Sequence, residues 1–225
     1  MELREALRTT GAVREFRPDP VPDDVLHRIL DTARFAPSGG NRQGWRIVVV
    51  KDPEVRGRLR DLYLPGWYEY LAMRAAGLTP FAPVTDEEAE RRAIADAKPV
   101  GEPGFAEHLD QVPVLLVFLA DLRALAAVDK DFDRYTLAGG ASVYPFAWNL
   151  LLAARDEGVG GVITTMPIRR EREVKDLLHV PDEFVVAAVL ALGKPVRQPK
   201  RLTRKPVEDF ATVDRFDGPP FTADA

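Results

Sequence analysis

The chain has 225 residues, of which 46% are hydrophobic and 29% are charged, and its formal net charge is -4. This length suits one medium-sized domain with a substantial core, and the slightly acidic balance gives no reason to expect a nucleic-acid partner. The sequence contains 0 cysteines, which excludes disulfides, thiolate metal sites and a cysteine nucleophile.

The N-terminal stretch "MELREALRTTGAVREF" lacks the apolar core of a secretory signal. The longest apolar runs, at residues 112–120 and 184–193, are about half of the ~20 residues that a membrane helix needs. We therefore expect a soluble, cytoplasmic protein that does not associate with a membrane.

The first third of the chain alternates between helical and strand patterns. Residues 1–9 predict a short helix, and a second helix is predicted to begin at Pro22 and to end at Pro37. The run "WRIVVVKD" at residues 45–52 is typical of a strand.

A long helical pattern follows over residues 53–77, and we expect it to break near Pro65-Gly66. Thr85 and Glu88 then have the spacing of a capping box. The segment after them is poor in large apolar residues, which predicts an exposed helix or a lid.

The second half contains two continuous apolar strands, at residues 111–121 and 183–193, which are too hydrophobic to have one wet face and should be central. Between them, residues 142–157 predict a helix that is apolar nearly all round, and residues 161–165 predict a short strand. A helix that is apolar all round must be buried in a core or in an interface.

Residues 167–181 predict the last helix, and the proline-containing segment from Lys194 onward has no clear periodicity. Few strands separated by long helices indicate an α+β or α/β fold, a small sheet with helices on both faces. We expect one domain over residues 1–195, with a variable lid at about 63–111, and a C-terminal arm over residues 196–225.

The small and polar run Pro37-Ser38-Gly39-Gly40-Asn41 separates a predicted helix from a predicted strand. Hydroxyl and amide groups offer hydrogen bonds, and glycines let a backbone approach a flat or anionic ligand closely. The same residue types also suit a plain turn. Composition alone leaves both interpretations open.

In "RTTGAVREF", Arg8 and Arg14 bracket small residues. Arginine suits bidentate contact with a phosphate, although two solvated surface arginines would give the same pattern. The chain has neither a Gly-rich Rossmann fingerprint after a strand nor a P-loop, so neither of those nucleotide sites is supported.

Two further segments admit a binding role beside a plain structural one. The glycines of "EGVGGVITTMP" either are packing devices or bring backbone N–H groups to a ligand, with Thr164 and Thr165 supplying hydroxyls. The basic cluster "KRLTRKPVEDF" is either solvated surface or brings Arg204 or Lys205 to a phosphate that Arg14 already binds.

Other chemistries lack the residues that they require. His27, His108 and His179 lie far apart without metal-ligand spacing. We expect structural roles for His27 and His179, whereas His108 either is structural or faces a site. No G-x-S-x-G nucleophile motif is present. We predict no metal site and no catalytic side chain. The tryptophans are expected in the core or in an interface: Trp45, Trp67 and Trp148.

Together and in this order, the four segments resemble the FMN-dependent nitroreductase family over roughly residues 6–210, and "GGASVYPFAWNLLLAARDEGVGGVITT" is similar to an actinobacterial-type subgroup. The resemblance implies an α+β fold with a small mixed, mainly antiparallel sheet flanked by helices. It also implies a homodimer with FMN in the subunit interface, the apolar helix in the dimer core, and the C-terminal arm wrapped around the partner subunit.

For the phosphate end of FMN, the resemblance implies that Arg14 binds the phosphate beside Gly11 and Ala12, with Arg204 as the second phosphate-binding arginine. Family members usually carry Arg or His, then Ser, where this chain has Gly11 and Ala12, so the contact is left to the backbone. Gly44 stands where a proline usually precedes the tryptophan.

For the ring end, the resemblance implies two sets of positions. One set matches the stretch near the flavin N5 and the pyrimidine edge: Thr164, Thr165 and Met166. The other set comes from the second subunit and lines the isoalloxazine and ribityl chain: Pro37, Ser38, Gly39 and Asn41.

The implied activity is transfer of hydride from NADH or NADPH through FMN to a nitroaromatic, quinone or activated alkene, by ping-pong turnover. The flavin supplies this chemistry, and the protein supplies position and electrostatics. Positive charge from Arg8 or Arg14 would favour the reduced flavin. Lid residues would set substrate choice: Tyr68, Tyr70, Phe81 and Phe105. The alternatives are an FMN-dependent oxidase or dehydrogenase of a specialised metabolite, a non-catalytic flavin-binding or storage protein, and a flavin-free interaction domain.

Overall fold

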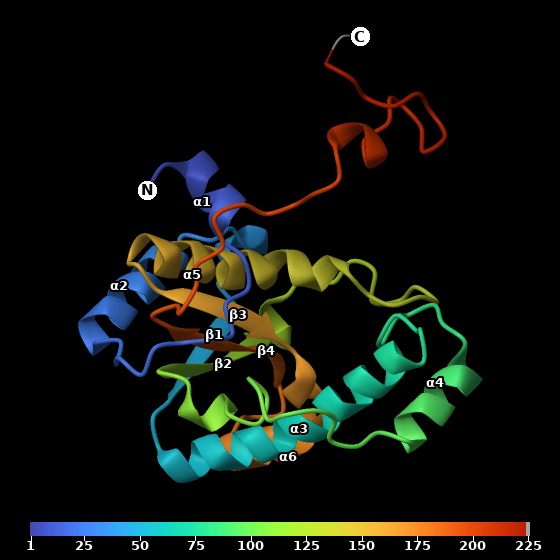
Figure 1. Cartoon of the computed structure of the whole chain (residues 1–225). Helices are drawn as coiled ribbons and strands as arrows, with labels where there is room; N and C mark the ends of the chain where they lie inside the picture. Colours follow the sequence, from blue (N-terminus) through green and yellow to red (C-terminus); the bar gives the residue numbers. More distant parts are fainter. Residues whose placement is uncertain (224–225) are drawn as a thin grey trace.

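The computed structural model describes residues 1–223 and centres on a four-stranded sheet in the order β1-β2-β4-β3 (Figure 1). The strands are β1 (Trp45–Val50), β2 (Val114–Asp121), β3 (Gly160–Thr164) and β4 (Phe184–Gly193). All three strand pairings are antiparallel. The two continuous apolar strands, β2 and β4, are the central pair, as their sequences predict.

Helices cover both faces of the sheet. The helices α2 (Asp23–Ala33) and α5 (Tyr144–Asp156) pack on one face, and α3 (Pro53–Ala75) and α6 (Glu171–Leu178) pack on the other (Figure 1). Because side chains alternate across a strand, each central strand contributes side chains to the hydrophobic layers on both faces of the sheet. This arrangement is an α+β fold.

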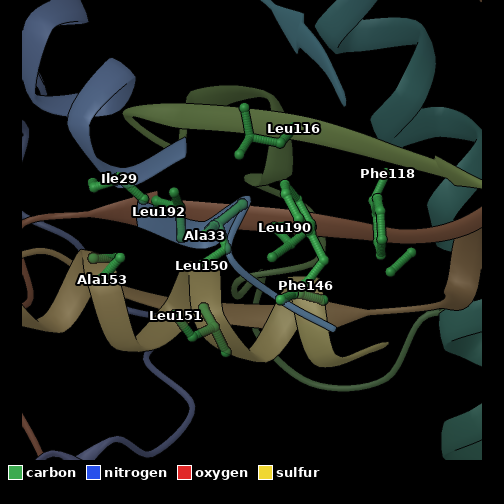
Figure 2. Packing of buried hydrophobic residues seen from close by; sticks show 14 of the residues in the cluster. Ile29, Ala33, Leu116, Phe118, Phe146, Leu150, Leu151, Ala153, Leu190 and Leu192 are labelled. Atoms are coloured by element: carbon green, nitrogen blue, oxygen red, sulfur yellow. The ribbon is translucent and has the colours of Figure 1, made fainter. Parts of the chain in front are cut away.

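Alternate residues of β2 belong to the two hydrophobic layers. Leu116 and Phe118 face α2 and α5, whereas Leu115 and Val117 face α3 and α6. Figure 2 shows side chains of α5, among them Phe146, packed beneath the sheet residues of the first layer. The core is therefore two apolar layers that share one sheet.

The helix α3 runs without a break through Pro65, so the expected break is wrong. A proline removes one N–H of the helix ladder, but burial on both sides of it keeps the halves in line. Leu59 and Met73 are fully buried. A Cβ on Gly66 would lie 2.9 Å from the carbonyl oxygen of Met166, so the middle of α3 packs against the chain after β3.

Two helix starts also differ from expectation. The helix α4 (Glu87–Ala95) is capped by Asp86, whose carboxylate accepts hydrogen bonds from the N–H groups of Glu88 and Ala89. A carboxylate at this position satisfies two free amides, and Thr85 stays outside the helix. The last helical segment begins as a 3-10 turn, Met166–Arg170, before α6.

The two ends of the chain meet on one side of the molecule. The helix α1 (Leu3–Thr9) packs near α5, and the backbone N–H of Leu202 donates to the carbonyl of Arg8. Beyond this contact the chain runs away from the sheet and its helices (Figure 1). Its tip is folded on itself, because the N–H of Phe221 donates to the carbonyl of Ala211.

Candidate functional site

The segment after α1 lies along the edge of the sheet. The N–H of Val13 donates to the carbonyl of Gly161, and Ala12 forms a parallel bridge with Gly161, which makes the sheet mixed at this edge. A Cβ on Gly160 would lie 2.9 Å from the Val13 side chain. These glycines therefore act as packing devices that let the arginine-bearing segment approach β3.

The C-terminal segment crosses the end of α1. The side-chain amide of Gln198 donates to the carbonyl of Thr9, and a Cβ on Gly11 would lie 2.8 Å from Leu202. The absence of a side chain at Gly11 lets the two segments cross closely, with the end of the Leu202 side chain beside the Gly11 backbone.

A cationic cavity of ≈ 780 Å³ opens where these two segments meet. It brings Arg8 together with Arg204, and Glu5 is its one acidic residue. Next in the chain after the lining residue Thr9, the hydroxyl oxygen of Thr10 is buried and has no hydrogen-bond partner among residues 1–223. The remaining lining residues are Thr9, Lys200, Arg201, Leu202 and Thr203.

Arg14 does not line this cavity, so the structure does not bring Arg14 and Arg204 to one anion within a chain. Val13 is buried against β3, and neighbouring side chains of an extended backbone point in opposite directions. Arg14 lines a separate cavity of ≈ 290 Å³ that Phe105 and His108 also line.

The end of β3 carries a buried pair of hydroxyls. The hydroxyl of Thr164 is hydrogen-bonded to that of Tyr63 on α3, at 3.1 Å. Burial raises the pKa of Tyr63, whereas the bond to Thr164 and the positive charge of Arg14 act in the opposite direction. Of the residues that follow, Thr165 is exposed and Met166 is half-buried against α3.

The helical spacing of Leu59, Tyr63 and Gly66 places these three residues on one face of α3. This spacing was the available signal for Tyr63, which the sequence motifs missed. Its partner Thr164 lies more than 100 positions later in the chain, so no local pattern connects the two hydroxyls.

The loop Pro37–Asn41 is held by hydrogen bonds within itself and to the segment before α5. The hydroxyl of Ser38 accepts a hydrogen bond from the N–H of Gln43, and the N–H of Gly39 donates to Ser142 before α5. Gly40 and Asn41 have positive φ values of 60 and 52 degrees, which suits these residue types. Pro37, Gly40 and Asn41 remain exposed.

Gly44 has a structural reason within the chain. A Cβ at this position would lie 2.6 Å from Ala124, and the carbonyl of Gly44 accepts a hydrogen bond from the N–H of Asp121. The close approach fixes the entry of the loop into β1. It also accounts for a glycine immediately before Trp45.

A third cavity, of ≈ 590 Å³, lies in the predicted lid region. Phe81 and Tyr135 supply aromatic side chains, and the guanidinium of Arg169 lies 4.9 Å from the ring centre of Phe81. Arg169 also forms an ion pair with Glu69 at 2.9 Å. Phe81 has a φ of 55 degrees, an uncommon conformation for a bulky residue that is found at ligand-binding loops.

The remaining candidates are spread over the fold. Tyr70 stacks on Trp67 with ring centres 5.3 Å apart, and His179 ends α6 in a left-handed conformation. Across residues 1–223 no three His, Cys, Asp or Glu side chains gather as metal ligands. None of the helices in this range is both long and apolar enough to span a membrane.

Comparisons with known proteins agree with this geometry at the level of the family. The model of the nitroreductase family matches residues 7–194. An NADH dehydrogenase from Thermus thermophilus is 30% identical over 208 residues, which are 92% of this chain and 94% of that protein.

Iodotyrosine deiodinase 1 from Pongo abelii is 27% identical over 214 residues, which are 94% of this chain and 68% of that protein. The chain spans 63% of the length of the Rattus norvegicus and Mus musculus deiodinases. A crystal structure of iodotyrosine deiodinase bound to FMN and 3-iodo-L-tyrosine has a TM-score of 0.66 at 24% identity, covering 96% of this chain and 100% of that chain. This likeness is one of fold.

Proposed function

The chain belongs to the nitroreductase family, and on that premise we propose that it is an FMN-dependent oxidoreductase that uses NADH or NADPH to reduce a small oxidising substrate. When bound, FMN supplies hydride transfer from the nicotinamide to the acceptor, in ping-pong turnover. Nitroaromatics, quinones and activated alkenes are the proposed acceptors. The observation that carries the proposal is the cationic cavity, which Arg8 and Arg204 both line. Arg14 lies outside this cavity, and its charge acts on Tyr63, the hydrogen-bond partner of Thr164.

The residues at the cationic cavity fit a phosphate monoester. Arg8 and Arg204 supply planar donors that suit phosphate oxygens. The unpartnered hydroxyl of Thr10 adds a buried hydrogen-bonding group next to Gly11 and Ala12, which have no polar side chains. We assign the phosphate to this cavity, with Arg8 taking the place first expected for Arg14.

The residues at the end of β3 fit the flavin ring. Arg14 lines a cavity together with Phe105, and its positive charge acts to lower the pKa of Tyr63, the partner of Thr164. We propose that this charge favours negative charge on a reduced ring. Thr165 and Met166 complete this edge through their backbone and side chains. No side chain of the protein has to act as an acid or a base in this proposal.

We also propose that two copies form the site. Pro37, Gly40 and Asn41 are exposed on one copy and available to the other, together with Ser38 and Gly39. On α5, Tyr144 and Trp148 are 47% and 37% exposed within a single chain, and the Tyr144 hydroxyl donates to the carbonyl of Ala187. A second copy would cover this stripe, and the arm that stands clear of its own chain would lie on that copy.

The lid cavity is the proposed place of the acceptor. The ring faces of Phe81 and Tyr135 suit a planar ring. Arg169, which also lines the cavity, is only three residues after Met166, a residue proposed for the flavin ring. A replacement here, such as Tyr135→Ala, should change the KM for the acceptor and leave the KM for the nicotinamide near its wild-type value. A change confined to the nicotinamide would place the acceptor elsewhere.

The first test is the visible absorbance of the purified protein at about 350–500 nm, because a bound flavin absorbs there. A protein concentration on the order of micromolar is sufficient. Turnover of NADH or NADPH with menadione, nitrofurazone or 3-iodo-L-tyrosine then separates the activities. A yellow protein without turnover would favour a storage role, and turnover with oxygen alone would favour an oxidase. A colourless protein that gains no absorbance with FMN would refute the proposal.

The two ends of the flavin are separated by comparing FMN with riboflavin, which lacks the phosphate. Arg204→Gln and Arg8→Gln should each weaken FMN about tenfold and leave riboflavin unchanged, because one charged hydrogen bond is lost. Arg14→Gln should weaken both ligands alike. Arg58→Gln, an exposed change on α3, is the control. Equal effects of Arg204→Gln on the two ligands would contradict the phosphate assignment.

Trp148→Asp tests the second copy. Sedimentation should show a monomer that no longer retains FMN, because a charge enters the stripe that the second copy covers. The chain itself should keep its helical content, since Trp148 is partly exposed in the single chain. A monomeric protein that still holds FMN would contradict the shared site.

A further inference from the structure

The cavity that Arg14 lines combines positive charge with aromatic surface. Arg14 and Arg17 supply two guanidinium groups, and His108 supplies an imidazole ring. Among residues 1–223, no Asp or Glu lines this cavity of ≈ 290 Å³. The other lining residues are Gln111 and a set of apolar residues: Phe16, Pro18, Phe105, Val112 and Pro113. This composition favours a ligand that carries both a negative charge and an apolar part.

The wall that carries Phe16 and Arg17 is fixed by the chain that follows β4. The N–H of Arg17 donates to the carbonyl of Lys194, and Phe16 forms an antiparallel bridge with Pro195. A Cβ on Gly193, the last residue of β4, would lie 2.9 Å from the Phe16 ring. The glycine thus lets Phe16 pack directly on the end of the strand, and this wall is already in place before a ligand binds.

The opposite wall is a short 3-10 turn, Leu109–Gln111, which follows His108. The N–H of Gln111 donates to the carbonyl of His108, and Arg56 on α3 donates to the carbonyl of Asp110. The side-chain amide of Gln111 lies 3.3 Å from Nδ1 of His108. Because an amide N–H can only donate, Nδ1 accepts, and the neutral imidazole carries its proton as a donor on Nε2.

The size and the lining of the cavity restrict the ligand. Small-molecule pockets typically have about 300–1,000 Å³, so a cavity of ≈ 290 Å³ suits a molecule with one ring and is too small for a dinucleotide. A carboxylate matches the fork of a guanidinium, and the rings of Phe16 and Phe105 suit an aromatic ring. The cationic cavity at Arg8 and Arg204 has more positive charge and fewer apolar residues, so the two cavities should select different anions.

We propose that this cavity binds a small aromatic carboxylate, with the carboxylate between the guanidinium groups of Arg14 and Arg17. The ring of the ligand lies against Phe16 and Phe105. The effect of this ligand on the cofactor rests on the proposed function, in which the charge of Arg14 favours the reduced flavin ring. A bound carboxylate offsets part of that charge and favours the oxidised flavin. By linkage, the oxidised protein binds the ligand more tightly than the reduced protein.

Calorimetric titration of the purified protein with benzoate tests the site. Acetate lacks the ring and benzamide lacks the charge, so each should bind about tenfold more weakly than benzoate. Arg17→Gln should weaken benzoate about tenfold, because a charge-assisted hydrogen bond is lost, and should leave the affinity for FMN unchanged. Arg58→Gln, at an exposed arginine on α3, is the matched control. An unchanged affinity for benzoate in Arg17→Gln would overturn the proposal.

The position of the ligand is checked with the ring signals of the histidines. The chain contains 3 histidines, so the nitrogen-15 spectrum of histidine-labelled protein is simple, and His108→Gln identifies the signal of His108. Benzoate should shift this signal and leave those of His27 and His179 in place. A loss of benzoate affinity in Arg169→Gln instead of Arg17→Gln would put the ligand in the lid cavity and overturn the proposal.

The effect on the cofactor is measured separately. Saturating benzoate should make the midpoint potential of the flavin more negative, by the amount expected for about threefold tighter binding to the oxidised protein. The same benzoate concentration should move the potential less in Arg17→Gln. A potential that benzoate does not move would overturn the coupling through Arg14.

The outcomes separate this inference from the proposed function. A wild-type protein that binds no FMN would refute the proposed function itself, whereas the benzoate titration and the histidine spectra can still be recorded on that protein. A wild-type protein that binds FMN and does not bind benzoate would refute the carboxylate site alone.

Discussion

The two faces of the sheet are built from different side-chain chemistry. The buried cluster against α2 and α5 consists of aliphatic side chains and phenylalanines, and the hydroxyl of Tyr144 at its edge donates to the carbonyl of Ala187. The layer against α3 and α6 admits Tyr63, and at its border the half-buried guanidinium of Arg56 donates to the carbonyls of Asp110 and Val50. Most buried polar groups of a protein have a hydrogen-bond partner, and Tyr63 and Arg56 follow this rule.

The difference between the two layers shows where polar functional side chains can be placed in this fold. An apolar layer contributes burial and little else, so its residues can change only at the expense of stability. The polar groups of the second layer hold loops and strand ends in defined positions. The proposed ring-end residues Arg14 and Thr164 lie beside that second layer, and the exposed face of α5 lies outside the first.

The largest effect should come from the apolar layer. Leu150 on α5 is fully buried, and Leu150→Ala should lower the free energy of unfolding by about 3–5 kcal/mol, because transfer and cavity terms add. Urea unfolding of the two proteins measures the difference. Leu137→Ala, at a residue that is 68% exposed, should stay within about 0.5 kcal/mol of wild type. Similar losses in both variants would break the contrast.

On the second face, Arg56→Met should lower the free energy of unfolding by about 2–3 kcal/mol, because buried carbonyls lose their donor. Arg56 also donates to the carbonyl of Val112, so one side chain joins α3 to the end of β1 and to the segment before β2. Burial lowers the pKa of Arg56, yet three carbonyls hold it in place. Arg58→Met, at an exposed arginine two residues further along α3, should have no measurable effect.

A smaller effect is expected at the helix caps. Asp52 accepts hydrogen bonds from the N–H groups of Glu54 and Val55, and Asp52→Ala should cost about 1 kcal/mol. Asp86 makes the same two bonds in α4, whose one buried residue is Ala93. Asp86→Ala should therefore alter local hydrogen exchange in α4 more than the global midpoint. Equal shifts of the global midpoint would show that α4 unfolds with the core.

The smallest effect should appear only in acid. The carboxylate of Asp129, which is 4% exposed, accepts from the N–H groups of Leu137 and Ala138 and pairs with Arg134. The hydrogen bond from Leu137 is the main cause of its lowered pKa.

A carboxyl with a lowered folded-state pKa adds stability above its unfolded pKa of about 3.9, and this stability is lost as the pH falls through the folded value. Stability of wild type should therefore drop more steeply below about pH 4 than that of Asp129→Asn. Unfolding curves recorded across the acid range measure the two slopes. Parallel curves would show that the loop before α5 does not depend on this carboxylate.

Sequence patterns predicted the sheet well and the helix details less well. The apolar runs of β2 and β4 identified the central pair because burial on both faces leaves a direct compositional trace. The continuity of α3 through Pro65 was not predictable, because its cause is contact with Met166, 100 positions later. The start of α4 was missed by one residue, since Asp86 and Thr85 are both good capping residues.

For the site, local patterns located segments and did not locate their partners. Arg8, Arg14 and Arg204 were all singled out, but which two share a cavity depends on the side-chain alternation that burial of Val13 imposes. Arg56 gave no signal, and the helical spacing of Tyr63 did not identify its partner, because the partners of both residues lie far away in the chain. The assignment of individual residues to FMN stays a prediction.

The folded tip of the C-terminal arm has a consequence for assembly. Residues 207–221 form a turn and a short bridge of their own, and a Cβ on Gly218 could not be accommodated beside the backbone of Val213. A tip with its shape already set loses little conformational freedom when it docks. If the arm lies on a second copy as proposed, the two copies should separate slowly, since both arms must release, and nicking near residue 204 should speed subunit exchange before it alters the fold of either chain.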